Sequence, residues 1–458
     1  MKPMAVQEMF RQWSLVVGPV FSVQLGKKHW VVLNSSEAVQ DLIVKRGTIY
    51  SSRDLPDVLV NDFMHGVDKG GGFAFYPYGK QWRHLRRIAH AGLVKQKIND
   101  YEPILDERRR ALLSSVFKAS DDVCGKAITL KTFIEHYTMT VILTIAFGNL
   151  CSFEPGDPRL HEVFDVTEQA ASIFGPAQQL CEFFPVLKPL LNKREWFEEI
   201  ERRHVNFYSD LYAEFTRLAD PKECFVKDVA TKKELTDMQI TDLIAVFVGA
   251  GSDTTSSTLQ WMIALLANRP EIQDRAYAEI VDNIGLGRLP SQSDESKLPY
   301  LQCIIHETLR LRSPAPLSVP HATSEDDIYQ GWLIPANTTI IINLHAIHRD
   351  PERYPNPLEF LPERHMDYVQ NPRDDFTQSV KDRPHLSFST GRRVCVGIHL
   401  AERSLYMAAA SLLACFRFEV DGKIDDISPK DIRSATFAPM PYKVRVVPRH
   451  KNIENLIS

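Results

Sequence analysis

The sequence contains no uninterrupted apolar run long enough to span a bilayer, which takes about 20 residues. Its first residues, MKPMAVQEMFRQWSLVVG, also lack the apolar segment of a secretory signal peptide. We therefore expect a chain that neither crosses a membrane nor carries a signal for secretion.

The sequence also has little excess charge and little cysteine. Its 54 basic and 58 acidic residues leave a net charge of -4, which excludes the overall basic bias of a dedicated nucleic-acid-binding protein. The seven cysteines are odd in number and widely scattered, so they do not indicate a disulfide framework. We expect a reducing compartment and, for any charged partner, a local binding patch.

No Ser/Gly linker, charge block or internal repeat divides the chain. Its 458 residues, 44% hydrophobic and 24% charged, have the composition of an ordinary folded protein with a large core. The length allows about three domains at roughly 150 residues each. Because no boundary is visible, we expect one domain over residues 1–458.

The secondary-structure patterns are mostly helical. The alternation in GPVFSVQLGKKHWVVLN predicts two short strands over residues 20–33, and SSEAVQDLIVKRG predicts a capped helix that ends at Gly47. Helical patterns dominate from Lys80 onward, and strand-like alternation returns in IYQGWLIPANTTIIINL and PYKVRVVP. The predicted class is mainly α with small β-sheets.

The longest helical pattern covers residues 236–269 and is apolar nearly all round, as in a helix through the middle of a large protein. Its centre, AGSDTTSS, is polar and small. Ala250 and Gly251 would let another group approach the backbone, and the Thr254 hydroxyl could compete for the carbonyl of Ala250 and loosen the helix. Asp253 could relay protons. A glycine kink on a half-exposed polar face explains the pattern equally well.

Two further segments combine charge with helical spacing. In YLQCIIHETLRL, Glu307 and Arg310 share one face of an apolar helix, and Arg364 of LPERH could complete a buried Glu-Arg-Arg brace, which is a structural role. In KQWRHLRR, Trp82 and Arg86 stand one turn apart and could hold an anion together. An ordinary solvated basic face is the alternative there.

Cys395 lies in LSFSTGRRVCVGIHL, directly before a predicted helix. Gly391 permits a tight turn, Arg393 brings a cation, and helix-start amides lower the pKa of a thiol. No histidine base completes a nucleophile, and no ligand set completes a zinc site. A small buried residue and a single axial thiolate on a haem iron are the interpretations that remain.

These segments together resemble the cytochrome P450 family. The F-x-x-G-x-R-x-C-x-G haem-binding pattern is filled by Phe388, Gly391, Arg393, Cys395 and Gly397. AGSDTT looks like the family's oxygen-activating stretch, Glu307 and Arg310 fill its E-x-x-R, and PERH stands in place of its P-E-R-F. The four motifs occur in the family's order and cover the chain from about Val20 to its end, so we expect the P450 fold with a long central helix over the haem.

The resemblance implies a haem b (iron protoporphyrin IX) site and roles for its residues. The implied cofactor-binding residues are Cys395 as axial iron ligand, Trp82, Arg86, Arg393 and His321 at the propionates, and Phe388, Gly391, Gly397, Ala250 and Gly251 around the ring. Thr254 and Asp253 would deliver protons to iron-bound dioxygen, while Glu307, Arg310 and Arg364 form the brace. The substrate pocket would involve residues 54–75, 170–189, 317–321 and 435–439.

The implied activity is that of a monooxygenase that oxidises a hydrophobic small molecule. Segments such as GPVFSVQLG and FYPYGKQWR are similar to filamentous-fungal members of secondary, mycotoxin-like metabolism. The implied partners are NADPH-cytochrome P450 reductase, through Lys80, Arg83, Arg87 and Arg392, and cytochrome b5, with no nucleic acid. A peroxide isomerase or dehydratase and a truncated inactive haem-binding product are the alternatives.

The family analogy also implies the cytosolic face of the endoplasmic reticulum membrane. Microsomal relatives begin with a membrane helix and a proline-rich hinge, and this chain shows neither. A soluble or shortened form is therefore expected, with peripheral contact to the membrane.

Overall fold

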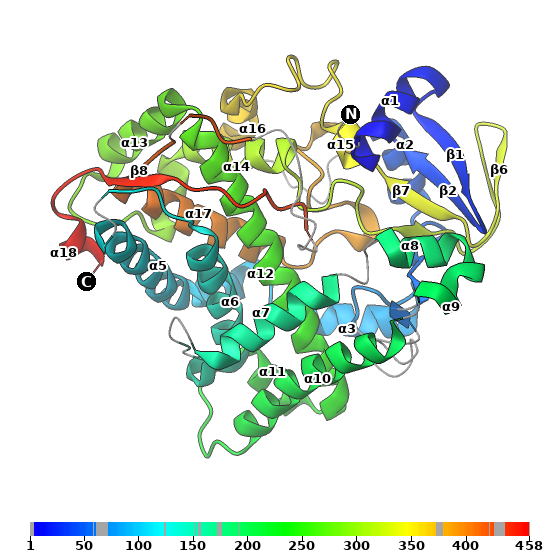
Figure 1. Cartoon of the computed structure of the whole chain (residues 1–458), viewed down its shortest axis with the longest axis horizontal. Coiled ribbons are helices and arrows are strands. Elements are labelled where there is room, and N and C mark those ends of the chain that lie inside the picture. The colour runs from blue at the N-terminus through cyan, green and yellow to red at the C-terminus, as the bar shows by residue number, and fades with distance from the viewer. Residues whose placement is uncertain are drawn as a thin grey trace.

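Helices make up most of the molecule, and short strands lie at two opposite sides of it (Figure 1). The computed structural model describes residues 4–57, 59–60, 72–122, 125–151, 153, 157–171, 176–191, 193–371, 379–420, 422–425 and 436–457. The α-helices are α1 (Val6–Val17), α2 (Ser36–Ala38), α3 (Lys80–Ala91), α4 (Lys95–Asp100), α5 (Glu102–Asp122), α6 (Lys131–Phe147), α7 (Pro158–Ala171), α8 (Pro176–Phe183), α9 (Lys188–Leu191), α10 (Arg194–Thr216), α11 (Phe225–Lys232), α12 (Asp237–Ala267), α13 (Pro270–Ile284), α14 (Pro299–Leu311), α15 (Leu344–Ile347), α16 (Met366–Gln370), α17 (Ile398–Cys415) and α18 (Ile453–Ile457). The expected class, mainly α with small sheets, is confirmed.

The strands form one five-stranded sheet and two two-stranded sheets. The sheet has the order β1-β2-β7-β4-β3, from β1 (Val20–Leu25), β2 (Lys28–Leu33), β7 (Thr339–Ile342), β4 (His321–Ala322) and β3 (Ser52–Arg53). The two-stranded sheets pair β5 (Asp327–Tyr329) with β6 (Trp332–Ile334) and β8 (Phe416–Glu419) with β9 (Arg445–Pro448). The two strands predicted over residues 20–33 are present as β1 and β2, which pair antiparallel.

The capped helix predicted before Gly47 is present in a modified form. The Ser35 side chain accepts a hydrogen bond from the backbone N–H of Ala38 and begins α2. The helix then continues as the π-helix η1 (Val39–Lys45). Of the seven cysteines, the six that the structure describes are free thiols, as expected for a chain without a disulfide framework, and Cys124 lies outside the described residues.

The long central helix α12 runs through the middle of the molecule (Figure 1). Thr236 caps it in a reciprocal capping box with Gln239. A Cβ atom at Gly251 would lie 2.8 Å from Cδ1 of Ile142, so the close approach at this glycine is made by α6. The helix is continuous from Asp237 to Ala267, through the polar centre that the sequence singles out.

Two hydrophobic cores meet at the loop that carries Cys395. The larger core joins the helices and includes Trp261 of α12, and the smaller one lies under the five-stranded sheet and includes Ile340 of β7. Leu386 belongs to the sheet core, whereas Phe388 packs against the helical core. The loop therefore spans the boundary between the two cores, which holds it from both sides.

Candidate active site

The loop before α17 has a defined backbone around Cys395. Residues Gly391–Arg393 form the 3-10 helix η9, and the backbone N–H of Cys395 donates a hydrogen bond to the carbonyl of Phe388 at 2.8 Å. Gly391 has a φ of 64°, and a Cβ atom there would lie 2.8 Å from the carbonyl oxygen of Ile43. Both the left-handed conformation and the close contact require glycine at this position.

Cys395 has the surroundings of a metal ligand and not of a free reactive thiol. Its side chain is exposed although protein atoms surround it, so the sulfur faces an internal space. Burial raises the pKa of the Cys395 thiol, and this outweighs the opposing effects of the Gly397 amide and of Arg86. The lowered thiol pKa expected from the sequence is therefore wrong, because desolvation is the largest contribution. A bound metal cation would deprotonate such a thiol outright.

A cluster of buried and half-buried cations lies beside this loop and consists of Arg53, Arg86 and Arg393, with the neutral imidazole of His321 next to them. Burial and the nearby charges of Arg53 and Arg86 lower the pKa of Arg393 to about 8. Burial and Arg86 lower the pKa of Arg53 to about 9. Within the described part of the chain, no carboxylate forms an ion pair with these three arginines. Buried charges need a partner of opposite sign, so the cluster fits an anionic ligand such as the two propionates of a haem.

The guanidinium groups of the cluster are anchored to backbone carbonyls and keep donors free. Arg393 Nε donates to the Ser51 carbonyl at 2.8 Å, while its Nη1 is buried without a hydrogen-bond partner in the described structure. Arg86 donates to the carbonyl of Val394 at 2.6 Å. The Trp82 ring lies 5.4 Å from the Arg86 guanidinium carbon and 4.3 Å from that of Arg393. The predicted residues Trp82, Arg86 and Arg393 are therefore brought together.

Sequence reasoning missed Arg53. Residue pairing between β3 and β4 sets Arg53 directly opposite His321, and Nδ1 of His321 is 2.7 Å from the Tyr50 carbonyl. Burial and Arg53 lower the pKa of His321 well below its ordinary value. The only sequence signal for Arg53 was its place in IYSSR, since its proximity to His321 depends on the strand register.

The basic segment of α3 has two different sides. Trp82 and Arg86 point into the cation cluster, whereas Arg83 and Arg87 are exposed, and Arg87 pairs with Glu234. The solvated basic face is therefore present at Arg83 and Arg87, whereas the anion site at Trp82 and Arg86 stays a prediction.

The polar centre of α12 has the hydrogen bond that the sequence suggested. Thr254 Oγ1 donates to the carbonyl of Ala250 at 2.8 Å, and Asp253 Oδ2 accepts a hydrogen bond from the backbone N–H of Thr436 at 3.2 Å. The helix remains continuous across this bond, so the expected loosening of the helix is not seen.

A second carboxyl group lies near Asp253 and was not identified from the sequence. Burial raises the pKa of Glu135 on α6 to about 7, and the charge of Asp253 adds to this rise. Lys131 Nζ lies 3.6 Å from a Glu135 carboxylate oxygen and opposes it. The central helix therefore has a titratable neighbour in the physiological range.

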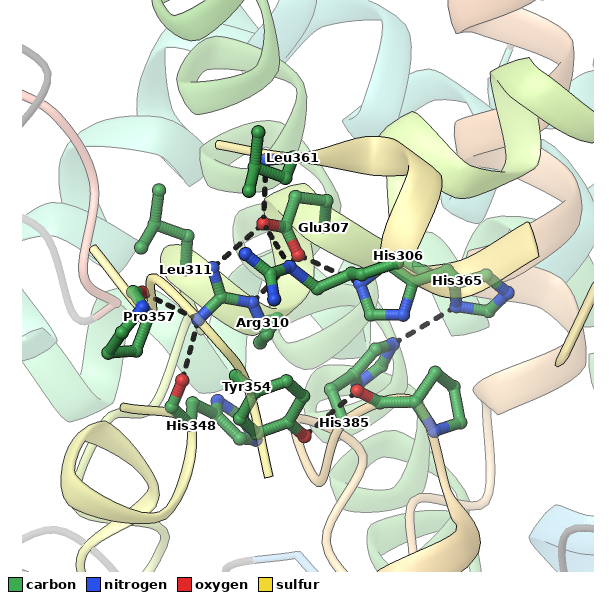
Figure 2. Close-up of polar contacts among 12 residues, drawn as sticks. His306, Glu307, Arg310, Leu311, His348, Tyr354, Pro357, Leu361, His365 and His385 are labelled. Atoms are coloured by element: carbon green, nitrogen blue, oxygen red, sulfur yellow. Dashed lines mark hydrogen bonds and ion pairs between the residues drawn. The ribbon is translucent and has the colours of Figure 1, made fainter. Parts of the chain in front are cut away.

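The expected brace around Glu307 is present (Figure 2). Arg310 binds both carboxylate oxygens of Glu307, at 2.7 and 2.8 Å, and Arg364 Nε binds at 3.1 Å. His365, which stands where the family has phenylalanine, joins the network through Nε2 at 2.8 Å. Burial alone would raise the pKa of Glu307, but hydrogen bonds from Arg310 and His365 lower it to about 2.

Parts of the expected substrate pocket lie outside the described residues. These are residues 58, 61–71, 172–175 and 435 of the ranges 54–75, 170–189 and 435–439. Residues 317–321 are described, and they lead into β4 beside the cation cluster.

Comparison with known proteins identifies the class. The family profile described as Cytochrome P450 matches residues 2–446. Cytochrome P450 monooxygenase 231 of Postia placenta is 32% identical over 98% of this chain and 86% of that protein, and cytochrome P450 monooxygenase fogE of Aspergillus ruber is 32% identical over 96% and 82%. A zebrafish cytochrome P450 structure with progesterone superposes with a TM-score of 0.82 at 25% identity, covering 98% of this chain and all of that one. The chain belongs to the cytochrome P450 family.

Members of this family are haem-thiolate monooxygenases, oxidoreductases that incorporate oxygen using electrons supplied by a reductase, and their substrates are generally hydrophobic. The buried cations and the cysteine described above fit the haem of this family. None of the helices in the described part of the chain is long and apolar enough to cross a bilayer.

Proposed function

We propose that Cys395 is the axial haem ligand of this monooxygenase and that Arg53, Arg86 and Arg393 hold the haem propionates, with His321 beside them. The observation that carries the proposal is the group of buried cations without a carboxylate partner in the described structure, beside a cysteine that faces an internal space. Bound haem supplies the reductive activation of dioxygen and the transfer of one oxygen atom to a C–H bond. The profile match over residues 2–446 supports a single P450 domain over residues 1–458.

The side chains of α12 handle protons in this proposal. Thr254 donates its hydroxyl proton to the Ala250 carbonyl and would supply a proton to the oxygen chemistry of a bound haem. Asp253 is held by the Thr436 amide and can pass a proton to Thr254 from the side of Glu135. General acid groups of this kind must lie within hydrogen-bond reach of the accepting atom. Ala250 and Gly251 keep this part of the helix free of bulky side chains.

The substrate is a hydrophobic small molecule of fungal secondary, mycotoxin-like metabolism. The two relatives described above are fungal monooxygenases, and the zebrafish cytochrome P450 is a structure with progesterone, which is a hydrophobic molecule. A third fungal relative, cytochrome P450 monooxygenase verL of Clonostachys rogersoniana, is 30% identical over 94% of this chain and 80% of that protein.

Electrons come from NADPH-cytochrome P450 reductase, with cytochrome b5 as a second donor, on the face that carries α3. Arg83 and Arg392 flank Tyr78, with guanidinium carbons 5.5 and 5.2 Å from its ring centre. Lys80 and Arg87 are exposed on the same helix as Arg83. An acidic partner would be attracted to this patch by complementary charge.

Exposed apolar side chains support peripheral contact with the endoplasmic reticulum membrane. Leu15 and Val16 of α1 are 74% and 85% exposed, and Val186 and Leu190 near α9 are each 80% exposed. Trp30 connects these two regions, since its ring centre lies 6.5 Å from that of Phe10 in α1 and 5.5 Å from that of Phe183 in α8. Exposed apolar side chains gathered in one region are typical of a membrane or protein contact.

The test is turnover of a panel of hydrophobic compounds by the haem-loaded protein with NADPH and reductase. The proposal expects a product that contains one oxygen atom from dioxygen and that requires NADPH. Conversion of a peroxide without NADPH would instead indicate an isomerase or dehydratase, and the absence of haem would contradict the assigned site.

A further inference from the structure

Two buried histidines hold the backbone of the loop that leads to Cys395. Nε2 of His348 accepts a hydrogen bond from the backbone N–H of Leu386 at 2.8 Å, and Nδ1 of His385 accepts one from the backbone N–H of Ser387 at 3.2 Å. Because a backbone N–H can only donate, each of these ring nitrogens must carry a lone pair. Both imidazoles are therefore neutral in this arrangement, and the tautomer of each is determined.

A third histidine, His306, accepts a hydrogen bond from His385. Nδ1 of His385 accepts the hydrogen bond from Ser387, so the proton of His385 is on Nε2. This nitrogen lies 3.3 Å from Nδ1 of His306. Nδ1 of His306 accepts the hydrogen bond from this N–H, so His306 carries its own proton on Nε2. Figure 2 shows His306, His365 and His385 gathered beside the pair of Glu307 and Arg310.

The charges that face these rings disfavour their protonation. Burial, Arg353, Arg310 and Arg349 lower the pKa of His348 well below its ordinary value. Burial and the rings of His306, His348 and His365, with Arg353, do the same for the pKa of His385. Burial and His365 lower the pKa of His306 to about 3.

The carboxylate beside the rings is already engaged. Glu307 is bound by Arg310, Arg364 and His365, so it offers no free partner for an imidazolium. Arg383 and Glu402 face the same region from a small pocket that His306 and His385 also line. Protons from solvent can reach the rings through this pocket, but the surroundings favour the neutral forms.

The two hydrogen bonds act on the cysteine through a short stretch of backbone. Ser389 N–H donates to the Leu386 carbonyl at 2.7 Å, and Ser387 Oγ donates to the Leu309 carbonyl at 2.7 Å. Phe388, which follows Ser387, accepts the hydrogen bond from the Cys395 amide through its carbonyl. A displacement of Leu386 and Ser387 would therefore move the carbonyl that holds Cys395.

We propose that neutral His348 and His385 are positioning residues for the cysteine loop, that His306 supports His385 by accepting its Nε2–H hydrogen bond, and that protonation of His348 or His385 releases the loop. The effect on haem ligation rests on the proposed role of Cys395, whereas the effect on the loop backbone does not. A protonated ring would turn an N–H toward the amide that it now accepts from, which breaks the hydrogen bond.

The first test follows the thiolate band of the reduced, CO-bound holoprotein as the pH is lowered. His348→Gln leaves an acceptor near the position of Nε2 but cannot take up a proton. The thiolate band of this variant should persist to lower pH than in the wild type. The number of protons taken up in the transition, which sets its steepness, should fall by about one. His385→Leu, which removes an acceptor, should lose the band at higher pH.

The matched control is His204→Gln on α10, which removes another buried imidazole whose pKa burial lowers to about 4. If the band is lost through release of the loop, this control should leave the acid transition unchanged, whereas loss through global unfolding would shift it as in His348→Gln. An equal transition in wild type, His348→Gln and the control would overturn the proposal. The increased acid resistance expected of His348→Gln cannot arise from misfolding.

The second test needs no haem. Amide hydrogen exchange at Leu386 and Ser387 in the full chain should accelerate on acidification in the wild type, relative to the intrinsic rate, and not in the double variant His348→Gln/His385→Asn. If the holoprotein shows no thiolate band at any pH while exchange behaves as expected, the assignment of Cys395 fails and the loop mechanism stands. Equal relative exchange in both proteins would refute the loop mechanism itself.

Discussion

Two groups of buried arginines in this molecule differ in their hydrogen-bond and ion-pair partners. Arg310 donates to both oxygens of Glu307 and to the carbonyls of His348 and Pro357. Arg393, in the cation cluster, has two carbonyl partners, a buried Nη1 without one, and a pKa that burial and neighbouring cations lower to about 8. A closed network of charges indicates a structural role, whereas a network that still needs an anion indicates a binding site.

Glu307→Gln should have the largest effect, because it leaves Arg310 buried without its counter-charge. The expected loss is about 3–5 kcal/mol of unfolding free energy, measured by urea unfolding of the apoprotein. Glu363→Gln, which breaks an exposed pair with Arg275, is the control and should cost less than about 1 kcal/mol. Similar losses in the two variants would remove the distinction between the closed network and an ordinary ion pair.

Arg86→Leu should weaken haem binding without lowering the stability of the apoprotein. It removes a cation that lowers the pKa of both Arg53 and Arg393, so the apoprotein should be no less stable than the wild type. Haem affinity should fall by about 1.5–3 kcal/mol, the value of a hydrogen bond to a charged group, which is roughly ten- to hundredfold. Haem transfer to apomyoglobin measures this. A loss of apoprotein stability with unchanged haem affinity would show that Arg86 belongs to a structural network.

His365→Phe restores the family's usual residue and tests how much His365 contributes to the brace around Glu307. It removes one hydrogen bond to Glu307, at a cost of about 1–2 kcal/mol at neutral pH. Burial lowers the pKa of His365, so below pH 6.5 the unfolded chain binds a proton that the folded protein does not. Wild-type stability should therefore fall faster than that of the variant as the pH drops below 6.5, in thermal unfolding between about pH 5 and 8, the range in which histidine titrates. Parallel curves would argue against a buried neutral His365.

Glu135→Gln should have the smallest effect and the opposite pH dependence. Because burial raises the pKa of Glu135 to about 7, the folded protein binds a proton that the unfolded chain has released between the ordinary carboxyl value of 4.5 and about 7. Wild-type stability is thus lost as the pH rises through this interval, and the variant should gain relative stability above about pH 7. A carboxyl infrared band that titrates near neutral pH in wild type and is missing in the variant would identify the group.

The parts of the structure that the sequence predicts depend on local patterns. The cap at Thr236, the strands over residues 20–33 and the approach of Arg364 to Glu307 each follow from spacing, polarity or a motif. The class of protein follows from motif order in the same way.

The missed features depend on contacts between distant segments. Arg53 joins the cation cluster only because β3 pairs with β4, and His348 reaches Leu386 across 38 residues of chain. The direction of the Cys395 pKa shift was also missed, because the helix-start amides are visible in the sequence while the extent of burial is not. Long-range pairing and desolvation are properties of the folded molecule.

The carbon-monoxide difference spectrum of the reduced, haem-loaded protein tests whether Cys395 is the axial ligand, because it reports that ligand itself. We expect the long-wavelength Soret band of thiolate ligation in the wild type and its loss in Cys395→Ala. A band typical of histidine or neutral thiol ligation in the wild type, or a thiolate band that survives Cys395→Ala, would contradict this assignment.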